Sequence, residues 1–280
     1  MSRRPSHPVR LLASALAAGA LLTTAACSDG DGSKNASDTA AEQAGVARPD
    51  AAKQTPTGSP SAPAALTEAG AKAALLTEAD LEGGWNQVQD ADKWRDRLLV
   101  GKVDVAAFLT AKSNATDCQA LLDALYDDGL LGDPSGPSAL TGFEQGDSRL
   151  LEQVAGYDRA GLDARLKWLR TLPDTCDEFT ATGSGGAKRT VQVTEASVPD
   201  VGDARTGLRV TVQGDADGGP ATLTLDIAAV RVGTSAVTVM GGGLDGGQSD
   251  SVAQAVRQGT ERLKTVLDGG TPSPQPTTMD

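Results

Sequence analysis

The chain has 280 residues, a formal net charge of −12 and only one histidine, His7. An acidic chain repels phosphate backbones, so we expect no nucleic-acid partner. With no histidine after His7, the sequence excludes Ser-His-Asp and Cys-His hydrolases and zinc sites that use imidazole. It also has no complete S-x-x-K, G-x-S-x-G or Walker A motif. We therefore expect no catalytic residues, no metal site and no cofactor.

The first residues have the anatomy of a bacterial export signal. A basic start is followed by the apolar stretch Leu11–Leu22, which is shorter than the roughly 20 residues needed to span a bilayer. The small residues before Cys27, ending in Ala26, resemble the lipobox of bacterial lipoproteins, in which diacylglycerol is attached to the cysteine. We expect residues 1–26 to be the signal peptide and Cys27 to be the lipidation site, on the extracytoplasmic face of the cell membrane. The alternative is a secreted protein that is cut after Ala26 and keeps Cys27 as a free thiol.

Residues 27–65 have the composition of a disordered tether. From Ser28 to Ala65 there are four prolines and almost no Val, Ile, Leu or aromatic residue. Such a segment cannot bury enough apolar area to offset the entropy of ordering. Residues 269–280, with three prolines, are predicted to be a disordered tail for the same reason. Residues 66–268 then suit one folded domain, and their low isoleucine content resembles that of actinobacterial proteins.

Helices and capped turns are predicted along this domain from apolar spacing and capping residues. In chain order they are Thr67–Leu75, the turn Thr77–Leu81 ended by Gly83 and Gly84, a helix opened by Thr116–Gln119, Asp158–Leu172, and a last helix capped by Asp250 or Ser251. Thr116 and Gln119 have the spacing of a capping box, and Pro173 should end the helix before it. Trp85 follows the first turn, and we expect it to fix that segment to the core.

Strands are predicted mainly in the second half, from apolar residues at every second position. The predicted strand regions are Ala139–Gly156 around the turn Gln145–Asp147, Arg189–Val198, Leu208–Gln213, Ala221–Ile227 and the hairpin partner at Val237 and Val239. Gly233 and Thr234 can form the two-residue turn of that hairpin. We predict an α+β fold in which an antiparallel sheet carries its helices on one face and one disulfide is present.

Cys118 and Cys176 are the only cysteines besides Cys27. In an exported domain, two remaining cysteines are expected to form a structural disulfide. The alternative is a redox pair, but such pairs are usually close in sequence, as in C-x-x-C. Because a large loop is closed, the bridge should stabilise the fold by roughly 4 kcal/mol.

Taken together, these pieces resemble the PknH-type extracellular sensor domain family, which includes actinobacterial lipoproteins and a mycobacterial receptor kinase. The resemblance is carried by Leu76–Leu81 before Gly84 and Trp85, by Cys118 opening a helix, and by Cys176–Phe179 after another helix. The kinase sensor has two disulfides, whereas this chain can form one. The resemblance implies a ligand-sensing or partner-binding domain and defines no functional residues.

Few residues suggest a site in the sequence alone. Asp215–Gly218 has the start of a calcium loop without its distal Glu, so a hairpin turn is favoured. Gly241–Gly247 precedes a helix as phosphate loops do, but it lacks the lysine, so a flexible connection is favoured. If the domain has a cleft, this segment and Trp94 or Trp168 are the first places to look. Trp168 lies in an amphipathic helix, so packing is its default role.

Three functions are compatible with these observations. The first is a non-catalytic, sensor-like lipoprotein that binds a cell-envelope ligand or protein. The second is a carboxylate-dependent hydrolase of envelope material, since Asp and Glu are abundant, and the third is a purely structural lipoprotein. Two carboxyls about 5–10 Å apart in one cleft, one of them with a raised pKa, would favour the hydrolase. A pocket with a few convergent polar groups would favour binding, and the structural role predicts no pocket.

Overall fold

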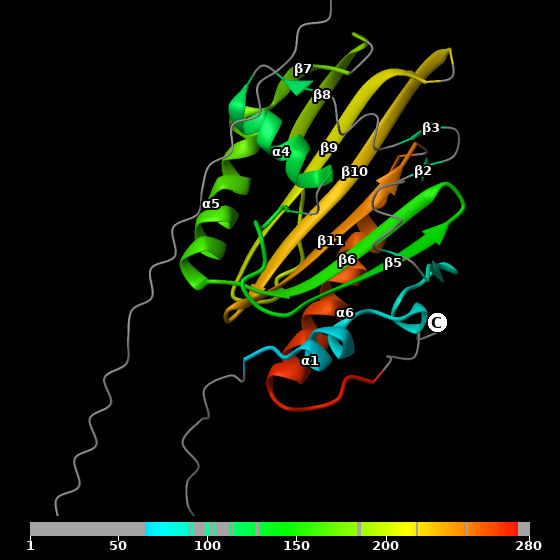
Figure 1. The fold of residues 1–280 in the computed structure, drawn as a ribbon. Coiled ribbons are helices and arrows are strands. Elements are labelled where there is room, and N and C mark those ends of the chain that lie inside the picture. Colours follow the sequence, from blue (N-terminus) through cyan, green and yellow to red (C-terminus); the bar gives the residue numbers. More distant parts are fainter. Residues whose placement is uncertain are drawn as a thin grey trace, which may run out of the picture. The chain divides into compact units, whose positions relative to one another are not determined.

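A ten-stranded antiparallel sheet forms the centre of the computed structural model (Figure 1). The structure describes residues 65–89, 91, 99–100, 103–104, 112–113, 115–126, 129–183, 186–216, 218–244 and 246–273. These all lie in one compact unit, Thr57–Asp280. The predicted signal peptide, Cys27, nearly all of the tether, Trp94 and the end of the tail lie outside the described residues.

The sheet order is β1-β5-β6-β11-β10-β9-β8-β7-β4, with β12 paired to β11. The strands are β1 (Asn86–Gln87), β4 (Lys112–Ser113), β5 (Ser138–Gln145), β6 (Ser148–Gly156), β7 (Glu178–Thr182), β8 (Lys188–Glu195), β9 (Ala204–Ala216), β10 (Gly219–Val232), β11 (Ser235–Gly243) and β12 (Gly246–Gly247). A separate small sheet pairs β2 (Leu99–Val100) with β3 (Val103–Asp104). The helical elements are α1 (Glu68–Ala74), the short η1 (Glu78–Asp80), α4 (Thr116–Tyr126), α5 (Arg159–Thr175) and α6 (Ser249–Leu267).

The turns of the long hairpins follow the sequence prediction. Val232 pairs with Ser235, so β10 and β11 are joined by Gly233 and Thr234, and Gly233 has a φ of 62°. Gln145 pairs with Ser148 across the β5–β6 turn in the same way. Gly219 pairs with Ala216 at the tip of the β9–β10 hairpin, and Asp215 and Ala216 are the last residues of β9. These short connections explain why long strands form from a chain with many glycines.

Two apolar cores lie on opposite faces of the sheet. Successive residues of β10 alternate between them: Ile227 and Ala229 belong to one core, and Ala228 and Val230 belong to the other. The first core contains the apolar faces of α4 and α5, and the second contains those of α1 and α6. The α+β class with an antiparallel sheet and one disulfide is thus confirmed, while the helices cover both faces and not one. Strands with apolar residues on both sides, such as β6 and β10, require this double cover.

The start of α4 and the end of α5 differ from the prediction. Helix α4 starts at Thr116, and the amide of Gln119 donates to the carbonyl of Ala115 at 2.9 Å, so the predicted cap residue is itself the first residue of the helix. Helix α5 continues through Pro173 to Thr175. The missing N–H of a proline costs one backbone bond, and the last turn is still closed by Cys176, whose amide donates to the Leu172 carbonyl at 2.7 Å.

Asp158 and Gln248 precede the two long helices. The Asp158 carboxylate accepts from the amide of Gly161 at 2.8 Å, as expected for the N-cap of α5. Helix α6 begins at Ser249 with Gln248 as its N-cap, so neither Asp250 nor Ser251 caps it as predicted. None of the described helices is long and apolar enough to cross a membrane.

Cys118 and Cys176 form the disulfide that the sequence analysis expected, with their Cα atoms 5.5 Å apart. Cys118 lies in the first turn of α4, and Cys176 is the C-cap of α5. Both are buried in the core that these helices share with the sheet. The bond therefore fixes two helices to the same end of one sheet face.

Candidate functional site

The first candidate is a cluster of charged side chains buried between β6, η1 and α6. Glu152 on β6 is completely buried, Asp80 on η1 is 2% exposed, and Arg262 on α6 is 8% exposed. Asp80 Oδ2 lies 3.3 Å from Arg262 Nη1. The cluster also holds the N-terminal segment: Glu152 Oε2 accepts from the amide of Leu76 at 2.7 Å, and Arg262 Nη2 donates to the Ala73 carbonyl at 3.1 Å.

Burial raises the pKa of Glu152 to about 8 from its usual value of 4.5. The bond from the Leu76 amide and the positive charge of Arg262 lower this pKa, and the nearby charge of Asp80 raises it, but each contributes less than desolvation. Glu152 is therefore mostly neutral at neutral pH. Its Oε1 has no hydrogen-bond partner in the described part of the chain.

This cluster brings two carboxyl groups together, one with a raised pKa, as a hydrolase would need. However, neither Glu152 nor Asp80 lines any of the three hollows of about 30, 250 and 490 Å³ in the described part of the chain. Gly259 lies against Glu152 so closely that an added Cβ would collide with Oε1. A substrate has no path to these carboxyls, so the geometry indicates that the cluster holds α1 and η1 on the sheet.

The second candidate is a polar pocket of about 250 Å³ under the first turns of α6. Its floor comes from β9 and β10, one wall from α6, and the other from the segment that follows β8. The lining residues are Thr194, Glu195, Ala196, Ser197, Pro199, Arg209, Asp226, Ile227, Ala228, Ser249, Val252, Ala253 and Val256. Polar groups and apolar side chains thus meet in one hollow, as they do in small-molecule sites.

A row of paired residues crosses the pocket floor. Thr194 pairs with Arg209, and Arg209 pairs with Asp226, so their side chains lie on the same face of three neighbouring strands. Arg209 Nε donates to Asp226 Oδ1 at 2.7 Å. The Asp226 side chain is 3% exposed and that of Arg209 is 43% exposed. The bond to Asp226 raises the pKa of Arg209, so the guanidinium stays charged.

Glu195 also borders this pocket, but its side chain belongs to the other face. It pairs with Leu208, whose side chain is in the core that contains α4 and α5. Strand alternation directs the Glu195 carboxylate to that side as well. Asp226 is therefore the pocket's one carboxylate on this face, and it is already bound to Arg209.

The glycine-rich segment Gly241–Gly247 lies beside this pocket. An added Cβ at Gly247 would collide with Asp226 Oδ2 and come within 3.2 Å of Arg209 Nη2. The expectation of a flexible connection is wrong for Gly241–Gly243, which belong to β11. Gly241, Gly243 and Gly246 also have the spacing of a G-x-G-x-x-G dinucleotide motif. That motif requires a parallel βαβ unit, and β11 is antiparallel to β6, β10 and β12.

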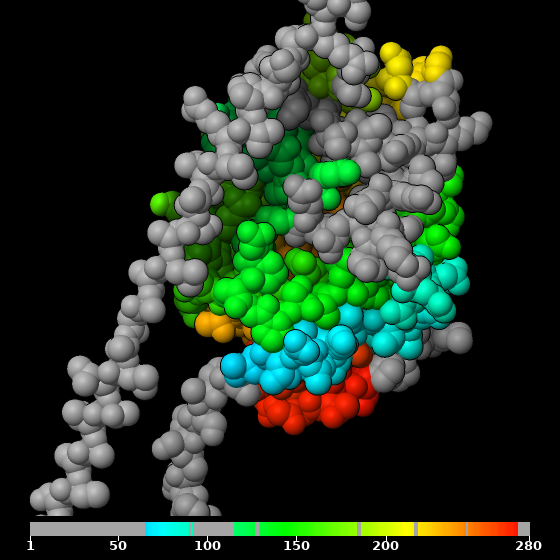
Figure 2. Space-filling view, in the orientation of Figure 1, coloured from blue at the N-terminus to red at the C-terminus, as the bar shows by residue number. Residues whose placement is uncertain are grey.

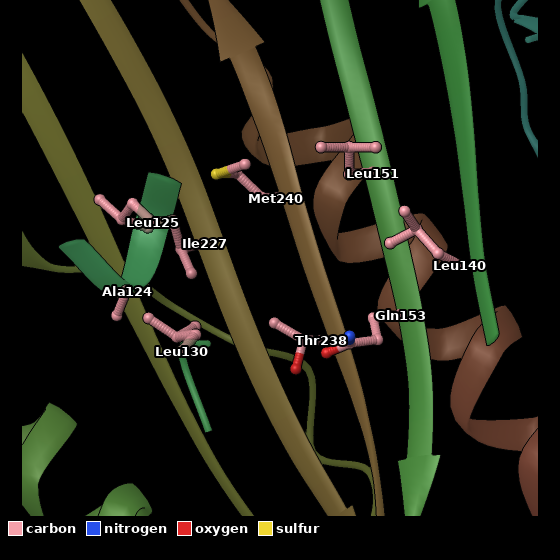
Figure 3. A pocket seen from close by; sticks show the side chains of 9 residues that line it. All are labelled: Ala124, Leu125, Leu130, Leu140, Leu151, Gln153, Ile227, Thr238 and Met240. Carbon is pink, nitrogen blue, oxygen red and sulfur yellow. The ribbon is translucent and has the colours of Figure 1, made fainter. Parts of the chain in front are cut away.

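Two further hollows are less suited to bind a ligand, one because of its size and the other because its arginines are already bound. An apolar one of about 30 Å³ lies between the end of α4 and strands β5, β6, β10 and β11 (Figure 3). Gln153 and Thr238 are its polar lining residues, and the space is no more than a water molecule occupies. A more open groove borders the polar pocket, but its arginines are engaged: Arg205 Nη2 lies 2.6 Å from Asp200, and Arg170 donates to the Arg205 carbonyl.

The aromatic candidate Trp168 does not line any of these hollows. It packs at the edge of the core on α5, and the Arg165 guanidinium carbon lies 4.4 Å from its ring centre. Trp85 is buried in the opposite core, as expected. Within the described ranges, no group of three or more His, Cys, Asp or Glu side chains is placed to hold a metal ion.

Sequence reasoning missed Arg209 and Asp226 because each stands between the apolar residues of an alternating strand, where the pattern predicts the face away from the core. Their opposite charges were visible, but the register that pairs them depends on where the β9–β10 hairpin turns. Their burial depends on α6, which covers this face of the sheet. The end of this helix and the residues that follow it form the red patch at the lower edge of Figure 2. The signal available in the sequence was an acidic residue, Asp226, between the apolar residues Leu225 and Ile227.

Comparison with known proteins gives little further information. No known protein family matches the chain, and no curated protein matches it. Among solved structures, it is similar to the extracellular domain of PknH from Mycobacterium tuberculosis. That likeness has a TM-score of 0.41 and 13% sequence identity, and it covers 73% of this chain and 98% of the other. It is too distant to support an argument about function.

Proposed function

We propose that the protein is an extracytoplasmic, lipid-anchored binding protein whose domain takes a small ligand into the polar pocket between α6 and strands β8, β9 and β10. The observation that carries this proposal is the preformed hollow of about 250 Å³ with a fixed arginine in its floor. Binding there requires no catalytic group. The anchor is supported by the small residues that lead into Cys27.

The geometry favours binding over the two alternatives. A glycosidase-type hydrolase needs two carboxyls facing one cleft. In the described part of the chain, the pair Glu152 and Asp80 is sealed in the core, and a second pair, Asp163 and Asp203, is held by ion pairs to Arg231. The polar pocket presents Asp226 alone on its face. A purely structural lipoprotein gives no reason for a hollow lined by an oriented ion pair. The binding reading accounts for both features.

The anchor is tested by a Cys27→Ser variant. We expect wild-type protein to incorporate a clickable fatty acid and to fractionate with membranes, and the variant to do neither, because the thiol is the acceptor of the diacylglycerol. The control is Ser28→Ala, which changes the residue beside the cysteine and leaves the thiol in place. A mature wild-type protein without label would contradict the proposal.

The pocket is tested by filling it. Ala253 lies on the pocket wall, so Ala253→Leu should reduce the space without removing a polar group. Arg257→Leu is the matched control, because Arg257 is exposed on the same helix and does not line the pocket. We expect small molecules from a cell-envelope extract to co-purify with wild type and with Arg257→Leu, and to be lost from Ala253→Leu. Equal recovery from all three folded proteins would rule out this pocket as the site.

A further inference from the structure

We propose that the pocket recognises a small carboxylate that carries a hydroxyl or amino group beside its acid group. This inference rests on the proposed binding function and names the class of ligand. The carboxylate would bind the outer edge of the Arg209 guanidinium, and the neighbouring donor group would bind Asp226. The carbon chain would lie against the apolar wall of α6.

The guanidinium of Arg209 has a fixed orientation and two terminal nitrogens that can bind an anion. Its Nε is bound to Asp226 Oδ1, which fixes the plane of the guanidinium. Among the described residues, none accepts a hydrogen bond from its two terminal nitrogens, Nη1 and Nη2. Two parallel N–H groups in a fixed plane match the two oxygens of a carboxylate. The arginine of the neighbouring groove differs, because Arg205 uses Nη2 to bind Asp200.

Asp226 provides the second, independent indication. Its carboxylate is almost fully buried, and Oδ2 has no hydrogen-bond partner within the described structure. Burying a carboxylate oxygen without a hydrogen-bond donor is unfavourable, so such an oxygen usually has a donor from the protein, from water or from a ligand. Unlike Glu152, Asp226 lines the pocket, and Gly247, which lies against Oδ2, adds no side chain between this carboxylate and the pocket. A hydroxyl or ammonium next to the ligand's carboxylate would supply the missing donor beside Arg209.

The remaining walls limit the size and charge of the ligand. Val252, Ala253 and Val256 of α6 form an apolar surface that suits a short branched carbon chain. The ion pair in the floor has no net charge, and the whole chain is acidic. A singly charged carboxylate is therefore favoured over a doubly charged phosphate, whose second charge would meet Asp226 without a partner.

The test uses three probes of the same shape: α-hydroxyisovalerate, valine and isovalerate, with inorganic phosphate as a fourth. Each is titrated into the ¹⁵N-labelled domain while the Arg209 Nε signal and the amide signals of Ser249–Val252 are followed by NMR. We expect saturable shifts at these positions, with α-hydroxyisovalerate or valine binding more tightly than isovalerate and phosphate binding least. Isovalerate or phosphate binding as tightly as the best probe would overturn the proposed ligand class.

Variants separate the two contacts. Arg209→Gln should weaken the best probe by at least about 10-fold, because it loses charge-assisted hydrogen bonds to the carboxylate. Asp226→Asn should reduce the preference for that probe over isovalerate. Arg205→Gln, on the same strand and face, is the control and should leave binding unchanged. Signals from the rest of the domain report that each variant is folded.

The outcomes also separate this inference from the proposed function. If an envelope ligand occupies the pocket, is lost from Ala253→Leu and is retained by Arg209→Gln, the pocket is a binding site and the carboxylate assignment is wrong. If neither the probes nor envelope extracts perturb the pocket signals, both proposals fail. Binding of the probes with equal loss in Arg205→Gln and Arg209→Gln would show a nonspecific charge effect and would also overturn the inference.

Discussion

Replacing Glu152 by glutamine should change how the stability of the domain depends on pH. Glu152 has a pKa of about 8 in the folded protein, compared with 4.5 for an ordinary glutamate, chiefly because burial penalises its charged form. In the unfolded chain the group ionises near its ordinary pKa. Between these two values the folded protein holds a proton that the unfolded chain has released, so the free energy of unfolding falls as the pH rises.

The size of this effect follows from the two pKa values. Each pKa unit corresponds to about 1.4 kcal/mol, so the interval from 4.5 to about 8 corresponds to on the order of 5 kcal/mol. The contribution of neutral Glu152 is complete below about pH 4.5 and is lost as the pH rises through about pH 8. Glutamine is neutral at every pH, and its carbonyl can still accept from the Leu76 amide. It should therefore remove this part of the pH dependence and stabilise the domain most at the alkaline end.

The measurement is the difference in free energy of unfolding between wild type and Glu152→Gln, from urea titrations at several pH values. Taking the difference cancels the other titrating groups. Glu144→Gln on the neighbouring strand is the control, because its side chain is 47% exposed and the substitution makes the same chemical change. The reasoning fails if the wild-type and Glu152→Gln curves run parallel, or if glutamine becomes less favourable as the pH rises.

Two further stability predictions follow from the packing. Replacing Cys118 and Cys176 by serine should lower the free energy of unfolding by about 4 kcal/mol, since the bond closes a loop with a sequence separation of 58; an unfolding midpoint unchanged by the double replacement would contradict this. Gly242→Ala should destabilise by about 1–3 kcal/mol, because its Cβ would collide with the Thr224 carbonyl on the paired strand. Both glycine variants are compared with wild type by chemical denaturation. Gly219→Ala is the control, because a Cβ at Gly219 would meet open space.

Much of the fold could be predicted from local sequence because the signals are local. The alternation of Leu208, Val210 and Val212 defines one buried strand face, and all three are in the core. The glycine turn at Gly233 sets the register of β10 and β11. In contrast, Glu178–Thr182 was not predicted as a strand, because it is stabilised by pairing with β8 and has little apolar pattern of its own. The prediction placed the helices on one sheet face because alternation alone does not show what covers the polar-looking side.

The candidate site was not predictable in the same way, because it depends on contacts between residues far apart in the chain. Asp226 occupies a position that would face water in an isolated hairpin, and it is buried only because α6 crosses that face. Glu152 is a comparable case: on its face of β6 it lies between Leu150 and Val154, and its partner amide, Leu76, is 76 residues away. A charged residue inside an apolar strand was visible in both cases, but its partner was not.

Helix α6 is the element on which both charged features depend. Its first turns supply Val252 and Val256 to the polar pocket, and its later turns supply Gly259 and Arg262 to the cluster around Glu152. The sheet face beneath it carries an ion pair at one end and a neutral acid at the other, each covered by the same helix. The N-terminal segment, held by Glu152 and Arg262, packs against α6 as well: Gly70 faces Val266 so closely that a Cβ there would come within 2.9 Å. The cluster thus fixes the helix that forms the pocket wall, which gives the costly buried carboxyl group a structural role in the shape of the pocket.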